Sequence, residues 1–164
     1  MCGAIIGEAR VAYAETTTVP VEKSIAEIVA LVKRAGAERI AQFDEPERFT
    51  VQFTMAGRMV RFRVTIPAME AMPKQDGRGR VLTRQQRIDR AAQAARQRAR
   101  ALLLVIKAKL ESVASEVETF EQAFLANVVM ADGATVYERI AAPVAQEYET
   151  GGTRMLLLGG PGKA

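Results

Sequence analysis

The residues best suited to chemistry in this chain are its cations, because they are concentrated in one part of the sequence. Residues 58–109 hold 14 Lys or Arg and 3 Asp or Glu, a formal charge of +11, whereas the other residues hold 9 and 16, a charge of −7. Clustered positive charge is the usual electrostatic footprint of a protein that binds phosphate-bearing partners. The pattern predicts nucleic acid, DNA or RNA, as the partner, and the alternative is a solvated surface on which Arg serves solubility and helix formation. The predicted nucleic-acid-binding residues are Arg61, Arg63, Lys74, Arg78, Arg80, Arg84, Arg87, Arg96, Arg98 and Arg100.

Catalytic chemistry is limited by the amino acids that the chain lacks. It has no His and a single Cys, which excludes the usual zinc sites, Ser-His-Asp and Cys-His catalysis and any His acid–base step. A hydrolase would need Lys chemistry or carboxylates with a divalent metal, and the nearest cluster is Glu116, Glu118 and Glu121. No His or Asp accompanies these glutamates, so we interpret them as the acidic start of a helix. We expect a protein that is not an enzyme and holds no metal or cofactor, with a metal-dependent enzyme as the least favoured alternative.

Many of the cations lie on one long predicted helix, residues 83–115. Thr83 and Gln86 can form a capping box at its start, and no Gly or Pro interrupts it. Apolar residues recur along it at steps of three or four and form one stripe. The stripe consists of Ile88, Ala92, Ala95, Ala99, Leu102, Ile106, Leu110 and Val113. Large residues fill a core and small ones let a helix approach closely, so we expect the C-terminal half to be buried. The basic half should pack against the helix predicted at 24–35 or against the same helix of a second copy.

An antiparallel hairpin precedes this helix. Residues 49–55 and 59–66 alternate between apolar and polar side chains around a turn at Ala56-Gly57, and residues 39–43 are a candidate third strand. One face of the hairpin is apolar and must lie on helices, while the other carries Arg61 and Arg63. No aromatic side chain is expected on this polar face, which argues against a base-stacking sheet. Residues 68–82 form a basic loop that could hold phosphate together with the start of the long helix.

The remaining segments predict shorter helices. Ser24 and Glu27 indicate a capping box that opens a helix ending near residue 36. Residues 116–130 are predicted as a second helix that turns Val117, Phe120, Phe124 and Val128 inward. A third helix follows a capping box formed by Thr135 and Glu138 and runs to about residue 148.

These elements predict one α+β domain over residues 21–150. It would consist of an antiparallel β-hairpin or small sheet packed with one long and two or three shorter helices. Residues 1–20 are predicted to form a flexible N-terminal segment, and residues 151–164 a tail rich in Gly and Leu. No apolar run approaches the ~20 residues of a membrane span, and the N-terminus lacks the pattern of a signal peptide. We therefore expect a cytoplasmic protein that does not enter membranes.

Several short runs, in this order, resemble a widespread family of small phage and prophage proteins. They are Ala12-Tyr13-Ala14-Glu15, residues 17–24 (TTVPVEKS), residues 57–62 (GRMVRF), residues 98–111 (RARALLLVIKAKLE), Thr119-Phe120-Glu121, Phe124-Leu125-Ala126 and Asp132-Gly133. The resemblance covers roughly residues 12–150 and brings no catalytic residues with it. It implies a viral or prophage origin, action inside a bacterial cell, and a place among replication, recombination or host-countering genes.

Together these observations predict a non-enzymatic phage accessory protein that binds nucleic acid. The binding surface would consist of the basic hairpin face, the loop and the N-terminal half of the long helix. The alternative is a phage protein that binds a bacterial host protein, such as a nuclease or a defence component, and inhibits or recruits it. The Ala-rich half of the long helix further predicts a homodimer or higher oligomer that nucleic acid tightens, because two Arg-rich surfaces repel each other until a polyanion neutralises them.

Overall fold

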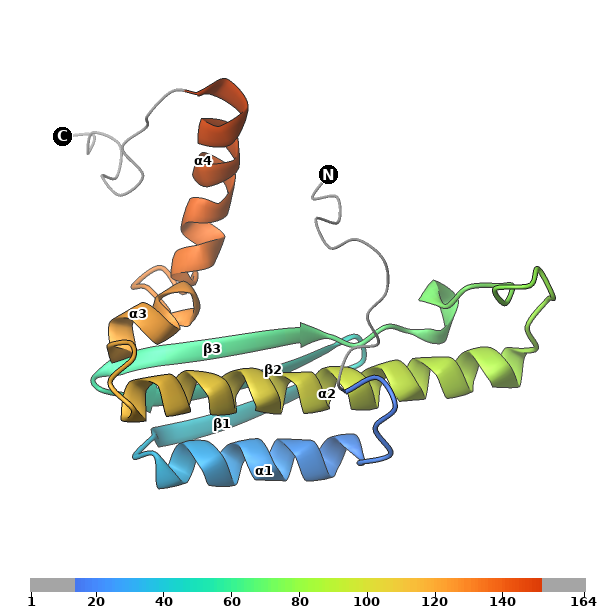
Figure 1. The fold of residues 1–164 in the computed structure, drawn as a ribbon, viewed down its shortest axis with the longest axis horizontal. Helices are drawn as coiled ribbons and strands as arrows, with labels where there is room; N and C mark the ends of the chain where they lie inside the picture. Colours follow the sequence, from blue (N-terminus) through green and yellow to red (C-terminus); the bar gives the residue numbers. More distant parts are fainter. Residues whose placement is uncertain (1–13, 152–164) are drawn as a thin grey trace.

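The computed structural model describes residues 14–151 and has an α+β fold, as predicted. Most of the predicted N-terminal segment and nearly all of the predicted C-terminal tail lie outside the described residues. The elements follow the chain as shown in Figure 1. They are α1 (Val21–Arg34), β1 (Glu38–Glu45), β2 (Arg48–Met55), β3 (Arg58–Thr65), the 3-10 turn η1 (Met69–Ala71), α2 (Arg84–Ala114), α3 (Phe120–Phe124), the 3-10 turn η2 (Leu125–Asn127) and α4 (Val136–Thr150).

The three strands form an antiparallel sheet in the order β1-β2-β3. The hairpin of β2 and β3 confirms the predicted alternation, and β1 adds the candidate third strand in a longer form than residues 39–43. The turn between β2 and β3 places both Ala56 and Gly57 at positive φ, 50° and 71°. Such a turn matches the right-handed twist of the strands that it joins. The register therefore aligns all apolar residues of the hairpin on one face.

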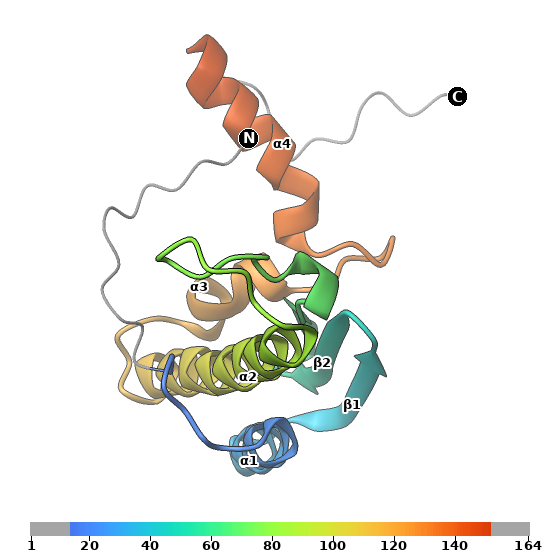
Figure 2. The same cartoon turned by 90° about the vertical axis from the view of Figure 1, so that its right-hand side faces the viewer.

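The core lies between this apolar face and the helices α1 and α2, which run side by side across it (Figures 1 and 2). The rings of Phe53, Phe62 and Phe124 meet there with centroids 6.3–6.4 Å apart. The C-terminal half of α2 is buried, as predicted, through residues such as Leu102 and Ile106. The N-terminal part of α2 extends beyond the sheet and α1 (Figure 1).

The predicted capping box at Ser24 is wrong. α1 begins at Val21, directly after Pro20, which has the extended backbone that precedes a helix. Ser24 therefore lies inside the helix, on the same face as Ile28 and Val32, and all three residues are fully buried. Among residues 14–151 its Oγ finds no hydrogen-bond partner. The capping boxes of Thr83 with Gln86 and of Thr135 with Glu138 are both confirmed.

The single helix predicted over residues 116–130 is also wrong. Thr119 takes an extended backbone as the cap of α3 and forms a capping box with Gln122, so a helix cannot run through it. The preceding residues form a connection in which Val117 is 75% exposed, although it was expected to point inward. After η2 the chain runs beside the sheet, where the Val129 N–H donates to the Met59 carbonyl at 2.8 Å. Phe124 and Val128 are buried, as predicted.

Candidate nucleic-acid interface

The loop before α2 has an ordered turn at its centre. Asp76 Oδ1 accepts the backbone N–H groups of Arg78 and Arg80, both at 2.9 Å, and its Oδ2 accepts Arg80 Nε at 3.0 Å. These bonds, the backbone N–H of Arg80 foremost, hold the pKa of Asp76 below its usual value. A bridge between Gln75 and Val81 closes the turn. The Asp76 carboxylate and backbone hydrogen bonds across the turn, such as that from the Leu82 N–H to the Lys74 carbonyl, therefore order residues 74–82.

Two of the predicted binding residues hold the fold together. Arg87 Nη2 donates to the carbonyls of Met69 and Glu70, at 3.0 and 3.2 Å, and ties α2 to the turn η1. Arg98 Nη1 donates to the carbonyl of Thr65, the last residue of β3. Each guanidinium thus uses some of its five N–H donors to hold backbone carbonyls of the fold, and Arg98 is otherwise exposed.

Two more of the predicted cations connect α2 to the N-terminal part of the chain. Arg100 Nη1 lies 2.7 Å from Glu27 Oε2 and joins α2 to α1. Arg96 donates to Gln93 Oε1 through both Nε and Nη2. The Gln93 amide nitrogen in turn donates to the carbonyls of Glu15 and Thr17. These cations thus anchor α1 and the segment before it to α2.

Five further cations come from the loop before α2 and from the first turns of α2, at the projecting end of the molecule (Figure 1). Within residues 14–151, the side chains of Lys74, Arg78 and Arg84 have no hydrogen-bond or ion-pair partner, and all three residues are exposed. The side chain of Arg80 is 75% exposed despite its contact with Asp76. Arg90 belongs to the same group, because its charge reaches Asp76 and helps to lower the pKa of that carboxyl. We call this set the basic end: Lys74, Arg78, Arg80, Arg84 and Arg90.

Arg90 was not among the residues predicted from the sequence. The signal was present, because Arg84, Arg87 and Arg90 follow one another at steps of three, a spacing that keeps them close on a helix surface. Arg90 is included in the basic end because of its proximity to Asp76 in the loop turn, and the sequence does not reveal that turn.

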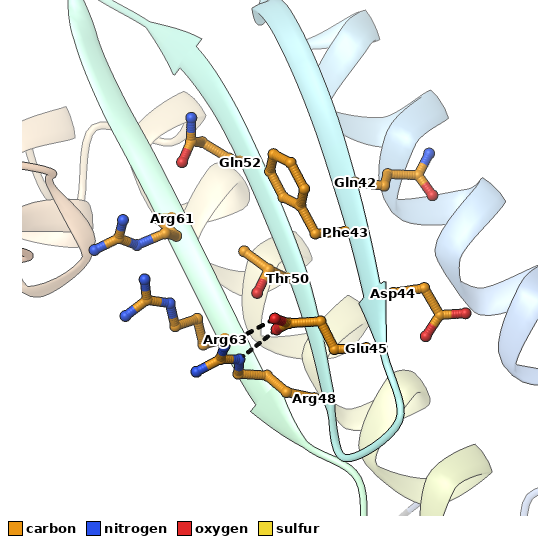
Figure 3. Close-up of a pocket in the computed structure, with 9 residues that line it drawn as sticks. All are labelled: Gln42, Phe43, Asp44, Glu45, Arg48, Thr50, Gln52, Arg61 and Arg63. Atoms are coloured by element: carbon orange, nitrogen blue, oxygen red, sulfur yellow. Dashed lines mark hydrogen bonds and ion pairs between the residues drawn. The ribbon is translucent and has the colours of Figure 1, made fainter. Parts of the chain in front are cut away.

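Arg61 and Arg63 lie on the face of the sheet opposite α1 and α2, where a shallow groove of about 570 Å³ is found (Figure 3). Along its edge Arg48 forms a two-bond ion pair with Glu45, at 2.6 and 3.0 Å. Phe43 lies in the same groove and is 52% exposed. The groove residues are Gln42, Phe43, Asp44, Glu45, Arg48, Thr50, Gln52, Arg61 and Arg63.

The polar face of the hairpin carries no aromatic side chain, as expected, but the third strand β1 adds Phe43 to the same face of the sheet. Phe43 is paired with Thr50 of β2, and Thr50 with Arg63 of β3, so the three residues form one row across the sheet. Directly opposed residues point to the same face. The sequence of β1 lacks a regular alternation, so the side on which Phe43 lies could not be read from it.

Glu138 neutralises both arginines of this face. Its Oε1 lies 2.7 Å from Arg63 Nη1, and its Oε2 lies 3.2 Å from Arg61 Nη2. Arg61 Nη2 also donates to the Gly133 carbonyl at 2.6 Å, and its side chain is only 11% exposed. The backbone N–H of Thr135 first, and then the two arginines, lower the pKa of Glu138. Arg61 is thus a structural link to α4, whereas Arg63 keeps a side chain that is 41% exposed.

No protein-family model matches this chain, and neither a curated protein nor a solved structure does. The likeness to phage and prophage proteins therefore stays a prediction.

Residues 14–151 show neither a metal site nor a membrane-spanning helix. Glu118 accepts a hydrogen bond from Ser112 Oγ at 2.6 Å. Among residues 14–151, no three His, Cys, Asp or Glu side chains gather where they could hold a metal ion. In the same part of the chain, no helix combines the length and apolar content of a membrane span.

Proposed function

We propose that the protein binds nucleic acid without catalysing a reaction on it, and that the basic end is its main contact surface. One observation carries this proposal: three exposed cations, Lys74, Arg78 and Arg84, have no carboxylate partner within the described residues. Glu27, Glu45 and Glu138 each hold a cation elsewhere in the fold. Both carboxylate oxygens of Asp76 accept hydrogen bonds within the turn. Asp76 therefore orders the loop, and it also neutralises part of the charge of Arg80.

Neighbouring unpaired cations repel one another, and a polyanion relieves this repulsion. Each phosphate that the protein neutralises releases condensed counterions, which is the main source of affinity for nucleic acid at low salt. The turn adds geometry to this charge, because the backbones of Arg78 and Arg80 are fixed by Asp76 rather than free to rearrange. Less conformational entropy is then lost on binding.

The proposed setting is the cytoplasm of a bacterial host, as an accessory protein of a phage or prophage. This part of the proposal rests on the resemblance of residues 12–150 to phage and prophage proteins. The alternative function, binding of a host protein such as a nuclease or a defence component, is an outcome of the test below.

The experiment compares two triple variants that change the net charge equally. Lys74, Arg78 and Arg84 are replaced by Glu in one, and Lys23, Lys33 and Arg34, which are exposed on α1, are replaced by Glu in the other. Binding to a fluorescent oligonucleotide is measured at low salt by anisotropy. The basic-end variant should lose orders of magnitude in affinity, whereas the α1 variant should lose far less because its cations make no phosphate contact.

Arg87 and Arg98 are left unchanged in these variants, because they donate to backbone carbonyls and their loss would also disturb the fold. Equal affinity of the basic-end variant and the parent would refute the proposal and favour a protein partner. Equal losses in both triple variants would mean that net charge alone, and not the basic end, determines binding.

A further inference from the structure

We propose that the open face of the sheet binds an unpaired nucleobase against the ring of Phe43, with the adjoining phosphate at Arg63. This inference rests on the proposed function and makes single-stranded nucleic acid the preferred partner. It assigns to the sheet a role that differs from that of the basic end: the basic end supplies charge, and the sheet face supplies a surface for stacking.

The row formed by Phe43, Thr50 and Arg63 defines the site. Neighbouring strands are about 4.8 Å apart, so the backbones of Phe43 and Arg63 are separated by roughly 10 Å. The short side chain of Thr50 lies between them and forms the floor of the groove (Figure 3). A flat ring on one side, a guanidinium on the other and a low floor between them match the base and phosphate of one nucleotide.

The exposure of Phe43 sets it apart from the other phenylalanines. The chain has six, and Phe49, Phe53, Phe62 and Phe124 are buried while Phe120 is partly buried. Phe43 instead is 52% exposed on the edge strand β1, where it borders the polar face. Both α1 and α2 lie on the opposite face of the sheet, so neither helix covers the ring (Figures 1 and 3).

The polar side chains around Phe43 can recognise a nucleotide. Arg63 uses Nη1 for Glu138, and within the described residues its Nε and Nη2 have no partner. Those two nitrogens remain able to donate to a phosphate oxygen. The amides of Gln42 and Gln52 line the same groove and carry both donors and acceptors for the edge of a base.

A single strand fits this site better than a duplex. Stacking on an aromatic ring requires a base whose face is free, and in a duplex each face is already stacked on a neighbour. Phe43 and Arg63 also lie close to the ends of β1 and β3, at the end of the sheet from which the chain leaves toward the basic end (Figure 1). One strand could therefore contact both surfaces.

The absence of Trp from the sequence allows a direct test. Phe43→Trp places a unique indole in the groove, and Val117→Trp places one at an exposed position in the connection between α2 and α3 as a matched control. The fluorescence of each variant is followed while a single-stranded oligonucleotide, or the duplex of the same sequence, is added. We expect quenching only for Phe43→Trp, and mainly by the single strand.

Affinity provides the second readout. Phe43→Ala and Phe43→Leu should each weaken single-strand binding by roughly 5- to 150-fold and leave duplex binding nearly unchanged. The Leu variant keeps an apolar side chain, so its loss would be due to the missing ring. Unfolding midpoints close to that of the parent confirm that both variants are folded.

The outcomes separate this inference from the proposed function. If the parent binds neither oligonucleotide, both fail. If the parent binds but the Phe43→Trp signal is constant and Phe43→Leu binds as the parent does, the stacking site is refuted while the proposed function stands. Equal quenching by duplex and single strand would refute the preference for unpaired bases.

Discussion

Arg63 of β3 and Glu138 of α4 are joined by an ion pair of 2.7 Å, although 75 residues separate them in the sequence. The other oxygen of Glu138 accepts the backbone N–H of Thr135 at 2.7 Å and completes the capping box of α4. One carboxylate therefore caps the last helix, attaches it to the sheet and reduces the positive charge of the open sheet face. The charge of this face and the position of α4 depend on the same residue.

Replacing Glu138 by Gln separates its role as a helix cap from its effect on the charge of the sheet face. Gln keeps the shape and can still take part in a capping box, but it no longer neutralises Arg61 and Arg63. Affinity for single-stranded oligonucleotide should rise several-fold at low salt, and the free energy of unfolding should fall by roughly 0.5–1 kcal/mol because charged hydrogen bonds become neutral ones. Glu149→Gln, at an exposed position of α4, serves as the control. An affinity for Glu138→Gln at or below that of the parent would contradict the role of Arg63.

Asp76 and Glu138 should contribute to the acidic limb of the pH dependence of stability, alongside Glu45 and Asp132, whose pKa values are also lowered. Hydrogen bonds from the backbone N–H groups of Arg80 and Thr135, respectively, are the main cause that lowers the pKa values of Asp76 and Glu138. A carboxyl whose pKa is lower in the folded state stabilises the fold fully above its unfolded value, near 3.8 for Asp76 and 4.5 for Glu138. This contribution is lost as the pH falls through the lowered values. Unfolding midpoints measured from neutral to acidic pH should fall less steeply for Asp76→Asn and Glu138→Gln than for the parent. Parallel curves would rule out this assignment.

Ser24→Ala should distinguish the buried position of Ser24 from the cap that the sequence predicted. An N-cap replaced by Ala typically loses about 1 kcal/mol of stability. A buried hydroxyl without a partner is unfavourable, so its removal should leave stability unchanged or raise it by up to about 1 kcal/mol. Thr83→Ala, at a confirmed cap, should lose about 1 kcal/mol in the same urea titration. A loss of that size in Ser24→Ala would show that the hydroxyl has a partner.

Ser24 also shows where the sequence was informative and where it was not. Local sequence patterns predicted the structure correctly where neighbouring residues determine it. Examples are the capping boxes of Thr83 and Thr135 and the alternating side chains of β2 and β3. Ser24 and Pro20 offered two possible helix starts, and α1 begins directly after Pro20. The sequence pattern alone did not show which of the two starts the helix uses.

The candidate site was less readable than the fold because contacts distant in sequence shape it. Glu27 and Glu138 neutralise Arg100 and Arg63 from 73 and 75 residues away, so the count of cations overstated the charge that is exposed. The side of the sheet on which Phe43 lies depends on its pairing with Thr50, which the irregular sequence of β1 did not reveal. Composition predicted a phosphate-binding region, and only the packing separates its structural arginines from its exposed ones.

The homodimer remains a prediction, and the structure sharpens its test. Ala92 is exposed and Ala95 partly buried, while Ala99 is buried within the chain. Ala92→Glu should therefore leave the monomer folded, yet prevent two α2 helices from packing at the short end of their usual separation of about 8–10 Å. Light scattering with and without oligonucleotide should detect an oligomer for the parent and a monomer for the variant. A parent that is monomeric under both conditions would exclude the dimer.

The most direct measurement is a titration of isotope-labelled protein with a single-stranded oligonucleotide, followed by the backbone amide signals in NMR spectra. The account predicts that the shifted signals belong to the basic end, around Asp76 and the first turns of α2, and to the sheet face around Phe43 and Arg63. Signals from the C-terminal turn of α1 and from α3 should not move, and added salt should reverse the shifts. Spectra that stay unchanged with excess oligonucleotide, or shifts confined to surfaces away from these two, would contradict the account.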